Sequence, residues 1–316
     1  MPHKKISTTA YTIVDSLSKL SKSQRFGKLI PKQMYYLNQI FATHAKDSFV
    51  KTLINILPLS VSTGIMDIFY IPGMTYHYLF RKLLIEKKLR NALQTGTTQI
   101  IVLGAGLDTL ALRIAKDEAT AVFFEIDLPY TQQAKLQILN EASHAIPNNC
   151  IFKTLDLATT NLAAVLLSDS HFNPKAATMV ILEGVLMYLT ESEVRTLFTD
   201  LHALITGDFT VIFGAISTPD TDKNHGVQIT NFFLRKGNEG TKWFCSGEDM
   251  PHFMDSLGYE LQEWMPYKKL QSVYRSQKEI NHICDDENYY VVSNKREDRK
   301  IASTPLSIER IPFISL

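Results

Sequence analysis

Cysteine is scarce in this chain of 316 residues, which contains three cysteines far apart in the sequence. Cys150, Cys245 and Cys284 form no CxxC pair, and any disulfide scheme leaves one of them unpaired. A disulfide-stabilised fold is therefore not expected. Unpaired thiols are typical of a reducing compartment, so the sequence predicts a cytoplasmic protein.

Several motifs with a defined chemistry are also missing. The sequence has no HExxH motif and no acidic calcium loop, so no metal site is expected. It has no GxSxG motif, which argues against an α/β-type hydrolase. Residues 1–12 lack the apolar run of a signal peptide. The apolar segment Leu53–Pro72 is interrupted by polar residues, so it is interpreted as buried helix and loop, and no membrane span is predicted.

A large net charge is lacking too. The chain has 33 basic and 32 acidic residues and a formal net charge of +1, so nothing in its overall charge favours a nucleic acid partner. Residues 1–50 differ from this average, because they contain eight lysines and arginines but two acidic residues. This segment either binds an anionic partner or presents a basic helix face to solvent.

From about residue 98 onward, short apolar runs alternate with amphipathic stretches, as in repeated strand–helix units around a parallel sheet. The predicted strands are Gln99–Leu103, Ala121–Ile126, Cys150–Leu155, Thr178–Leu182 and Thr210–Gly214, followed by a late strand at Asn288–Ser293. Thr190 and Glu193 have the spacing of a capping box, and the apolar residues that follow recur on one helix face. The sequence therefore predicts an α/β fold.

The chain before residue 95 is mainly helical in pattern, and Met74–Leu93 is predicted to form a helix that ends near Gly96. Residues 1–95 are interpreted as an N-terminal helical cap, and residues 96–316 as the core. A polar stretch at about 217–247 interrupts the core. A connection of this length is either a functional lid or an ordinary surface excursion, and the lid is preferred. The last residues, 295–316, are expected to form a surface tail.

The main functional signal is the segment IIVLGAGLDT at residues 100–109, an apolar strand followed by a glycine turn and a helix that begins near Leu107. Gly104 and Gly106 allow a sharp turn and let a ligand approach without meeting a Cβ atom. Thr109 occupies the place of the third glycine of the dinucleotide fingerprint GxGxxG. A cofactor without phosphates is therefore favoured over one with a pyrophosphate.

Acidic residues follow the next two predicted strands. Asp127 lies 21 residues after Gly106, close to the spacing at which a carboxylate binds ribose hydroxyls in such folds. Glu125 lies on the same strand face, so the sequence does not decide which carboxylate reaches a sugar. Asp156 could accept a hydrogen bond from an adenine amino group while Leu157 packs on the ring, or Asp156 could cap a helix.

Charged residues beside the fourth strand complete the candidate site. Glu183 ends this strand at the carboxyl edge of the sheet, where it faces either a cationic ligand group or solvent. Arg81 precedes the core and could clamp a carboxylate, although Lys82 and Arg90 are nearby and most such charges are solvated. Tyr188 is a candidate for the substrate side or a packed core tyrosine.

Together, Arg81 and the motifs LGAGLDT, FFEIDLP, LDL and ILEGVLMYLTESE resemble the leucine carboxyl methyltransferase family, which includes bacterial O-methyltransferases of small molecules. The similar part runs roughly over residues 76–200. The resemblance implies a Rossmann-like class I methyltransferase fold with a mostly parallel seven-stranded sheet and helices on both faces. It also implies S-adenosylmethionine as the cofactor.

The resemblance assigns roles to individual residues. The implied cofactor-binding set is Arg81, Gly104, Gly106, Asp127, Asp156, Leu157 and Glu183. The glycines would line the methionine part, the aspartates would bind ribose and adenine, and the glutamate would contact the amino acid portion. The arginine would bind the carboxylate of the cofactor or of the substrate. The family usually has Thr and Asp where this chain has Lys82 and Glu86, and it directs an N-terminal basic residue toward the cofactor, for which Lys22 and Arg25 are candidates.

The sequence thus predicts an S-adenosylmethionine-dependent O-methyltransferase that acts on a carboxylate of a small molecule or peptide. A carboxylate with a pKa of about 4 is ionised at neutral pH, so in-line methyl transfer to it needs alignment and exclusion of water but no general base. A hydroxyl acceptor would need a base, and the sequence nominates none. The alternatives are a non-catalytic module that binds this cofactor or docks a protein and, less favoured because of Thr109, an NAD-linked oxidoreductase.

Overall fold

The computed structural model describes residues 8–43, 74–158, 161–217, 240–275 and 287–295. The predicted apolar segment Leu53–Pro72, most of the predicted lid at 217–247 and nearly all of the predicted tail at 295–316 lie outside the described residues. In the part of the chain that is described, no helix is both long enough and apolar enough to cross a membrane.

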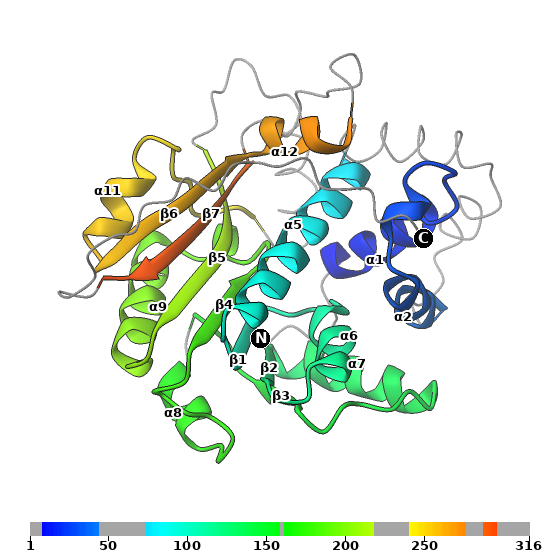
Figure 1. Ribbon diagram of the computed structural model, residues 1–316, viewed down its shortest axis with the longest axis horizontal. Coiled ribbons are helices and arrows are strands. Elements are labelled where there is room, and N and C mark those ends of the chain that lie inside the picture. The colour runs from blue at the N-terminus through cyan, green and yellow to red at the C-terminus, as the bar shows by residue number, and fades with distance from the viewer. Residues whose placement is uncertain (1–7, 44–73, 159–160, 218–239, 276–286, 296–316) are drawn as a thin grey trace.

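A seven-stranded sheet with the strand order β3-β2-β1-β4-β5-β7-β6 forms the centre of the molecule (Figure 1). The strands are β1 (Gln99–Leu103), β2 (Val122–Asp127), β3 (Cys150–Thr154), β4 (Thr178–Leu182), β5 (Phe209–Ile216), β6 (Tyr259–Pro266) and β7 (Glu287–Asn294). Neighbouring strands among β1 to β5 pair in parallel, whereas β7 runs antiparallel to β5 and β6. The strand order reverses between β1 and β4, the position at which open α/β sheets bind ligands.

The six predicted strands are confirmed, with ends that agree to within two residues. β6 is a strand that the sequence analysis does not predict. It lies at the edge of the sheet, has a register shift between Leu261 and Glu263, and exposes part of its length. An edge strand of this kind carries charged residues among its apolar ones and so lacks the continuous apolar pattern of a central strand.

Helices cover both faces of the sheet. The alternation of strand side chains explains this, because Ile101 and Leu103 of β1 pack on one face while Ile100 and Val102 pack on the other. The first face is covered by α8 (Leu162–Leu167), α9 (Glu191–Leu204) and α11 (Met250–Asp255). The second is covered by α5 (Met74–Gln94), α6 (Leu110–Asp117) and α7 (Pro129–Glu141).

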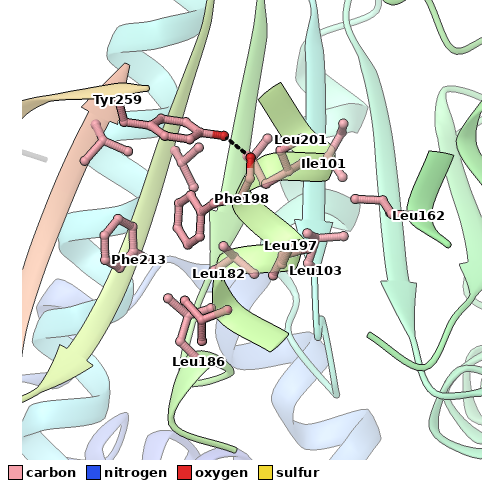
Figure 2. Close-up of a cluster of buried hydrophobic side chains, with 14 of the residues drawn as sticks. Ile101, Leu103, Leu162, Leu182, Leu186, Leu197, Phe198, Leu201, Phe213 and Tyr259 are labelled. Atoms are coloured by element: carbon pink, nitrogen blue, oxygen red, sulfur yellow. Dashed lines mark hydrogen bonds between the residues drawn. The ribbon is translucent and has the colours of Figure 1, made fainter. Parts of the chain in front are cut away.

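Helix α9 shows how local sequence signals and packing agree. The predicted capping box is confirmed: Thr190 Oγ1 accepts from the Glu193 backbone N–H at 3.4 Å, and Glu193 Oε2 accepts from the Thr190 N–H at 2.6 Å. The apolar face of α9 is buried on the sheet (Figure 2). In the same cluster the Tyr259 hydroxyl donates to the Phe198 carbonyl at 2.7 Å, which ties edge strand β6 to this helix.

The N-terminal helices pack beside the carboxyl ends of the central strands. They are α1 (Thr8–Leu20), the short 3-10 helix η1 (Gly27–Leu29) and α2 (Lys32–Thr43). Figure 1 shows α1 between α5 and α2, and α1 contacts both of these helices. Helix α2 also contacts α6 and α7. Helices α5, α1, α2 and α7 therefore lie in this order beside the carboxyl ends of the central strands, where the glycine turn lies.

Candidate cofactor site

The glycine turn after β1 depends on backbone conformations that favour glycine. Gly104 has φ +68° and Gly106 has φ +50°, both in the left-handed region. The turn is fixed to β2 because the N–H groups of Gly104 and Ala105 donate to the Ile126 carbonyl at 2.8 and 3.2 Å. A Cβ atom on Gly104 would lie 2.2 Å from Cγ2 of Val185. This position therefore excludes any side chain for two independent reasons.

A cavity of about 450 Å³ opens beside this turn, at the carboxyl ends of β1 to β4. This volume is within the range of sites for small ligands and cofactors. The sequence-predicted residues that line the cavity are Gly104, Gly106, Asp127, Asp156, Leu157, Glu183 and Tyr188. Arg81 is the one member of the predicted set that does not line it.

Asp127 is the strand-end acid that reaches the cavity. Its Oδ2 accepts from the Gly106 N–H at 2.6 Å and its Oδ1 from the Leu128 N–H at 2.7 Å. Burial raises the pKa of Asp127, while these hydrogen bonds oppose the rise. Glu125 instead forms a fully buried ion pair with Lys135 and does not line the cavity. Of the two acids, the structure therefore places Asp127 and not Glu125 in the cavity wall.

Asp156 lies in the loop after β3 together with Leu157, and both line the cavity. The Asp156 carboxylate accepts from the Ala158 N–H at 3.0 Å, a bond within a turn. The residue that caps helix α8 is Asn161, whose side chain accepts from the Ala164 N–H at 3.2 Å. The alternative role of Asp156 as a helix cap is therefore taken by a different residue.

The two carboxylate oxygens of Glu183 differ in their contacts with the described residues. Its Oε1 accepts from Arg81 Nε at 3.0 Å and from Lys82 Nζ at 3.1 Å. Its Oε2 is buried and has no hydrogen-bond partner among the described residues. A buried carboxylate oxygen without a donor is costly, so it marks a place where a ligand donor can bind.

Arg81 lies behind Glu183 rather than at the cavity wall. Its guanidinium also contacts Glu287 Oε1 at 3.5 Å. Burial alone would lower the pKa of Arg81, but Glu183 and Glu287 raise it. The neighbouring Lys82 does line the cavity, and it bridges Glu183 to Asp108, whose Oδ1 is 3.2 Å from Lys82 Nζ. Lys82, one of the two residues that depart from the family pattern, thus supplies a cation to the site.

Glu86, the second departure from that pattern, has a structural position. Its Oε2 accepts from Arg113 Nη2 at 2.8 Å and its Oε1 accepts from Arg90 Nη2 at 2.8 Å. Burial alone would raise the pKa of Glu86, but the two arginines lower it. Glu86 therefore joins α5 to α6 without lining the cavity.

The N-terminal helices contribute cavity residues that the sequence analysis did not nominate. They are Thr9, Ala10, Ile13 and Val14 of α1 and Asn38 of α2. The two basic candidates are elsewhere: Lys22 and Arg25 are exposed and do not line the cavity, and Arg25 Nη2 donates to the Tyr274 carbonyl at 3.0 Å. No local pattern distinguishes Asn38, because its position follows from how α2 packs on the core.

The described end of the stretch at 217–247 also borders the cavity. Gly240 and Lys242 line it, and the Lys242 backbone N–H donates to the Met187 carbonyl at 2.8 Å, next to Tyr188. The Lys242 side chain is exposed. One end of the cavity therefore has Tyr188 and Lys242 in its wall, and residues 218–239 of the predicted lid lie outside the described residues.

The ion pairs behind the site predict a stability that depends on pH. Burial alone would raise the pKa of Glu287, but His77, with Nε2 2.7 Å from Glu287 Oε2, and Arg81 lower it from 4.5 to about 2. A carboxylate whose pKa falls on folding stabilises the protein above its unfolded pKa, and that contribution disappears as the pH falls from 4.5 toward 2.

We expect Glu287→Gln to lower the free energy of unfolding by about 3 kcal/mol at pH 7, because one pKa unit corresponds to about 1.4 kcal/mol. Urea unfolding of both proteins at several pH values measures the difference. The difference in the free energy of unfolding between the two proteins should be constant between pH 7 and 5.5 and should decrease below pH 4.5. A difference that stays unchanged down to pH 3 would contradict the assignment.

The fold has a clear counterpart among solved structures. A crystal structure of a protein from Thermobifida fusca YX, provisionally described as a methyltransferase, superposes with a TM-score of 0.60. The sequences are 14% identical, and the superposition covers 93% of this chain and 97% of the other. With its sheet order and its cavity at the switch point, the chain has the Rossmann-like fold of a methyltransferase.

Sequence comparison defines the protein further. A provisionally named S-adenosyl-L-methionine-dependent methyltransferase of Bacillus subtilis (strain 168), YktD, is 28% identical over 67% of this chain and 70% of its own length. A provisionally named enzyme of the same class from Mycobacterium bovis (strain BCG / Pasteur 1173P2) is 32% identical over 38% of each chain. The profile of the leucine carboxyl methyltransferase family matches residues 38–202, just over half of the chain. The chain belongs to the leucine carboxyl methyltransferase family, and it is an S-adenosylmethionine-dependent methyltransferase.

Proposed function

We propose that the cavity binds S-adenosylmethionine and that the enzyme transfers its methyl group to a carboxylate of a small molecule or peptide. The observation that carries this proposal is the composition of the cavity wall. In the described part of the chain the wall contains hydrogen-bonding groups suited to the cofactor but no histidine that could serve as a general base. An acceptor that is already ionised fits such a site.

The polar groups of the wall match the cofactor from one end to the other. Asp127 is suited to the ribose hydroxyls, and Asp156 with Leu157 to the adenine, because they follow adjacent strands. Glu183 Oε2, which accepts no hydrogen bond from the part of the chain that is described, is suited to the ammonium group of the amino acid portion. Lys82, the cation that lines the cavity beside Glu183, is suited to its carboxylate.

When bound, S-adenosylmethionine supplies an electrophilic methyl group on a positively charged sulfur. The chain then has to hold the acceptor in line with that methyl group and exclude water from the acceptor oxygen. The side of the cavity proposed for the methyl group and the acceptor has Val185, Tyr188 and Leu189 in its wall. These side chains limit the access of water. Lys242 places a positive charge at the same end, which favours an anionic acceptor.

The chemical nature of the product tests the proposal. The enzyme is incubated with S-adenosylmethionine labelled in its methyl group and with a panel of carboxylic acids, peptides, phenols and amines. A methyl ester is hydrolysed by mild base and releases volatile labelled methanol, whereas a methyl ether or methylamine retains the label. We expect base-labile product from the acids. Label that is stable to base would overturn carboxyl methylation while leaving methyl transfer intact.

Asp127→Ala should weaken the binding of S-adenosylhomocysteine about tenfold or more in calorimetry, because the ribose would lose a charged hydrogen-bond acceptor. Asp255→Ala is the matched control, since it removes an exposed carboxylate on α11 that does not line the cavity. We expect the control to bind like the wild type. Unchanged affinity in Asp127→Ala would remove this residue from the proposed site.

A further inference from the structure

Helix α2 places one polar side chain in the wall of the cavity. Asn38 is 2% exposed, and its Nδ2 is buried without a hydrogen-bond partner among the described residues. The residues beside it on the helix, Leu37, Ile40 and Phe41, pack in an apolar cluster of the core. A buried amide donor without an acceptor destabilises a protein, and native structures contain few of them. Asn38 therefore needs an explanation that its neighbours among the described residues do not provide.

The position of α2 indicates which end of the cavity Asn38 serves. The helix contacts α6 and α7, and α1 separates it from α5 (Figure 1). Helix α7 begins at Pro129, two residues after Asp127, and Thr131 in its first turn also lines the cavity. Glu183, in contrast, is at the opposite end beside α5. Because α7 follows Asp127, these contacts place α2 toward the half of the cavity suited to the nucleoside.

The chemistry of a nucleoside requires donors as well as acceptors from the protein. A ribose hydroxyl donates one hydrogen bond and has two lone pairs, and an ionised carboxylate such as Asp127 can only accept. The hydroxyl oxygens and the ring nitrogens of the adenine therefore remain available for a donor. An amide N–H supplies that donor without adding charge.

We propose that Asn38 Nδ2 donates a hydrogen bond to the nucleoside half of S-adenosylmethionine, so that the N-terminal helices form part of the cofactor site. This inference rests on the proposed location of the cofactor in the cavity. It adds a binding residue that is remote in sequence from the glycine turn and the strand-end acids. It also gives a reason for an unpartnered buried amide in an otherwise apolar helix face.

Two ligands and two variants test the role of Asn38. S-adenosylhomocysteine contains the nucleoside and the amino acid portion, and methylthioadenosine contains the nucleoside without the amino acid. We expect Asn38→Leu and Asn38→Ala each to weaken the binding of both ligands about three- to tenfold in calorimetry, the effect of one lost hydrogen bond. Gln39→Ala is the control, since it removes a hydrogen bond from Gln39 to Ser18 of α1 without altering a cavity residue.

The stability of the ligand-free protein gives a second readout that a purely structural role would not produce. Leucine has nearly the shape of asparagine but no donor, so Asn38→Leu removes the unpartnered amide from the interior. We expect the melting temperature of ligand-free Asn38→Leu to rise by about 2 °C or more, although its affinity for both ligands falls. A structural asparagine would give the opposite sign, because its replacement would lower the melting temperature.

Three results would overturn the inference. Affinities within twofold of the wild type in both Asn38 variants would show that no hydrogen bond is lost. A loss confined to S-adenosylhomocysteine would place the donor at the amino acid portion, and an equal loss in Gln39→Ala would show a general loosening of the helices. These results leave the proposed function intact if the wild type binds both ligands. A wild type that binds neither would overturn the proposed site and the inference together.

Discussion

Replacement of Glu183 by glutamine should reduce the affinity for S-adenosylhomocysteine about a hundredfold and abolish measurable methyl transfer. The carboxylate accepts from Arg81 and Lys82 through Oε1 and leaves Oε2 for a ligand donor. A hydrogen bond to a charged group contributes about 1.5–3 kcal/mol, and removing one partner of a buried ion pair costs about 3–5 kcal/mol. We therefore expect loss of binding together with a lower free energy of unfolding.

Glu86→Gln separates these two effects. Glu86 is also a buried carboxylate that accepts from two cations, but it does not line the cavity. We expect it to lower the free energy of unfolding while leaving the affinity for S-adenosylhomocysteine close to that of the wild type. Calorimetry and urea unfolding of both variants make the comparison. Equal loss of affinity in the two would show that stability, and not a contact with the ligand, accounts for the Glu183 result.

The two ligands also distinguish Glu183 from Asn38. Methylthioadenosine lacks the amino acid portion, so Glu183→Gln should bind it nearly as well as the wild type does. The Asn38 variants should lose affinity for both ligands. This difference in ligand dependence would assign the two halves of the cavity to the two ends of the cofactor. Loss of methylthioadenosine binding in Glu183→Gln would contradict the placement of the amino acid portion at this residue.

Substitution of Gly104 by alanine should lower the free energy of unfolding by about 3 kcal/mol and eliminate cofactor binding. Two costs contribute: a left-handed conformation costs about 1–2 kcal/mol for a residue with a Cβ, and inserting a methyl group into packed structure costs about 1–3 kcal/mol. The added Cβ would lie 2.2 Å from Val185 Cγ2. Because Val185 also lines the cavity, its displacement would change the shape of the site.

A double-mutant cycle with Val185→Ala separates the two costs. Truncation of Val185 removes the atom that the new methyl group meets, so part of the lost stability should return in Gly104→Ala/Val185→Ala. Gly96→Ala is a remote control, since Gly96 also has a positive φ but no atom lies within 4 Å of its Cβ position. We expect that variant to retain cofactor binding. Strictly additive effects at positions 104 and 185 would show that the contact does not govern the turn.

Much of the fold and part of the candidate site were predictable because they depend on local features of the chain. The glycine turn and the capping box at Thr190 are local in sequence, and the periodic apolar runs define the central strands. The carboxyl ends of parallel strands meet at one edge of the sheet, so residues that follow different strands come together there. This is why Asp127, Asp156 and Glu183, far apart in sequence, line one cavity.

Tertiary structure decided what the local sequence could not. Glu125 and Asp127 share a strand face, yet only Asp127 reaches the cavity because Lys135 pairs with Glu125 in the interior. Arg81 and Lys82 are adjacent, but the helix direction places only Lys82 at the wall. Asn38 enters the site through the packing of α2. The glycine turn is fixed by backbone conformation within a few residues, whereas these positions depend on contacts between segments far apart in the chain, which no local pattern contains.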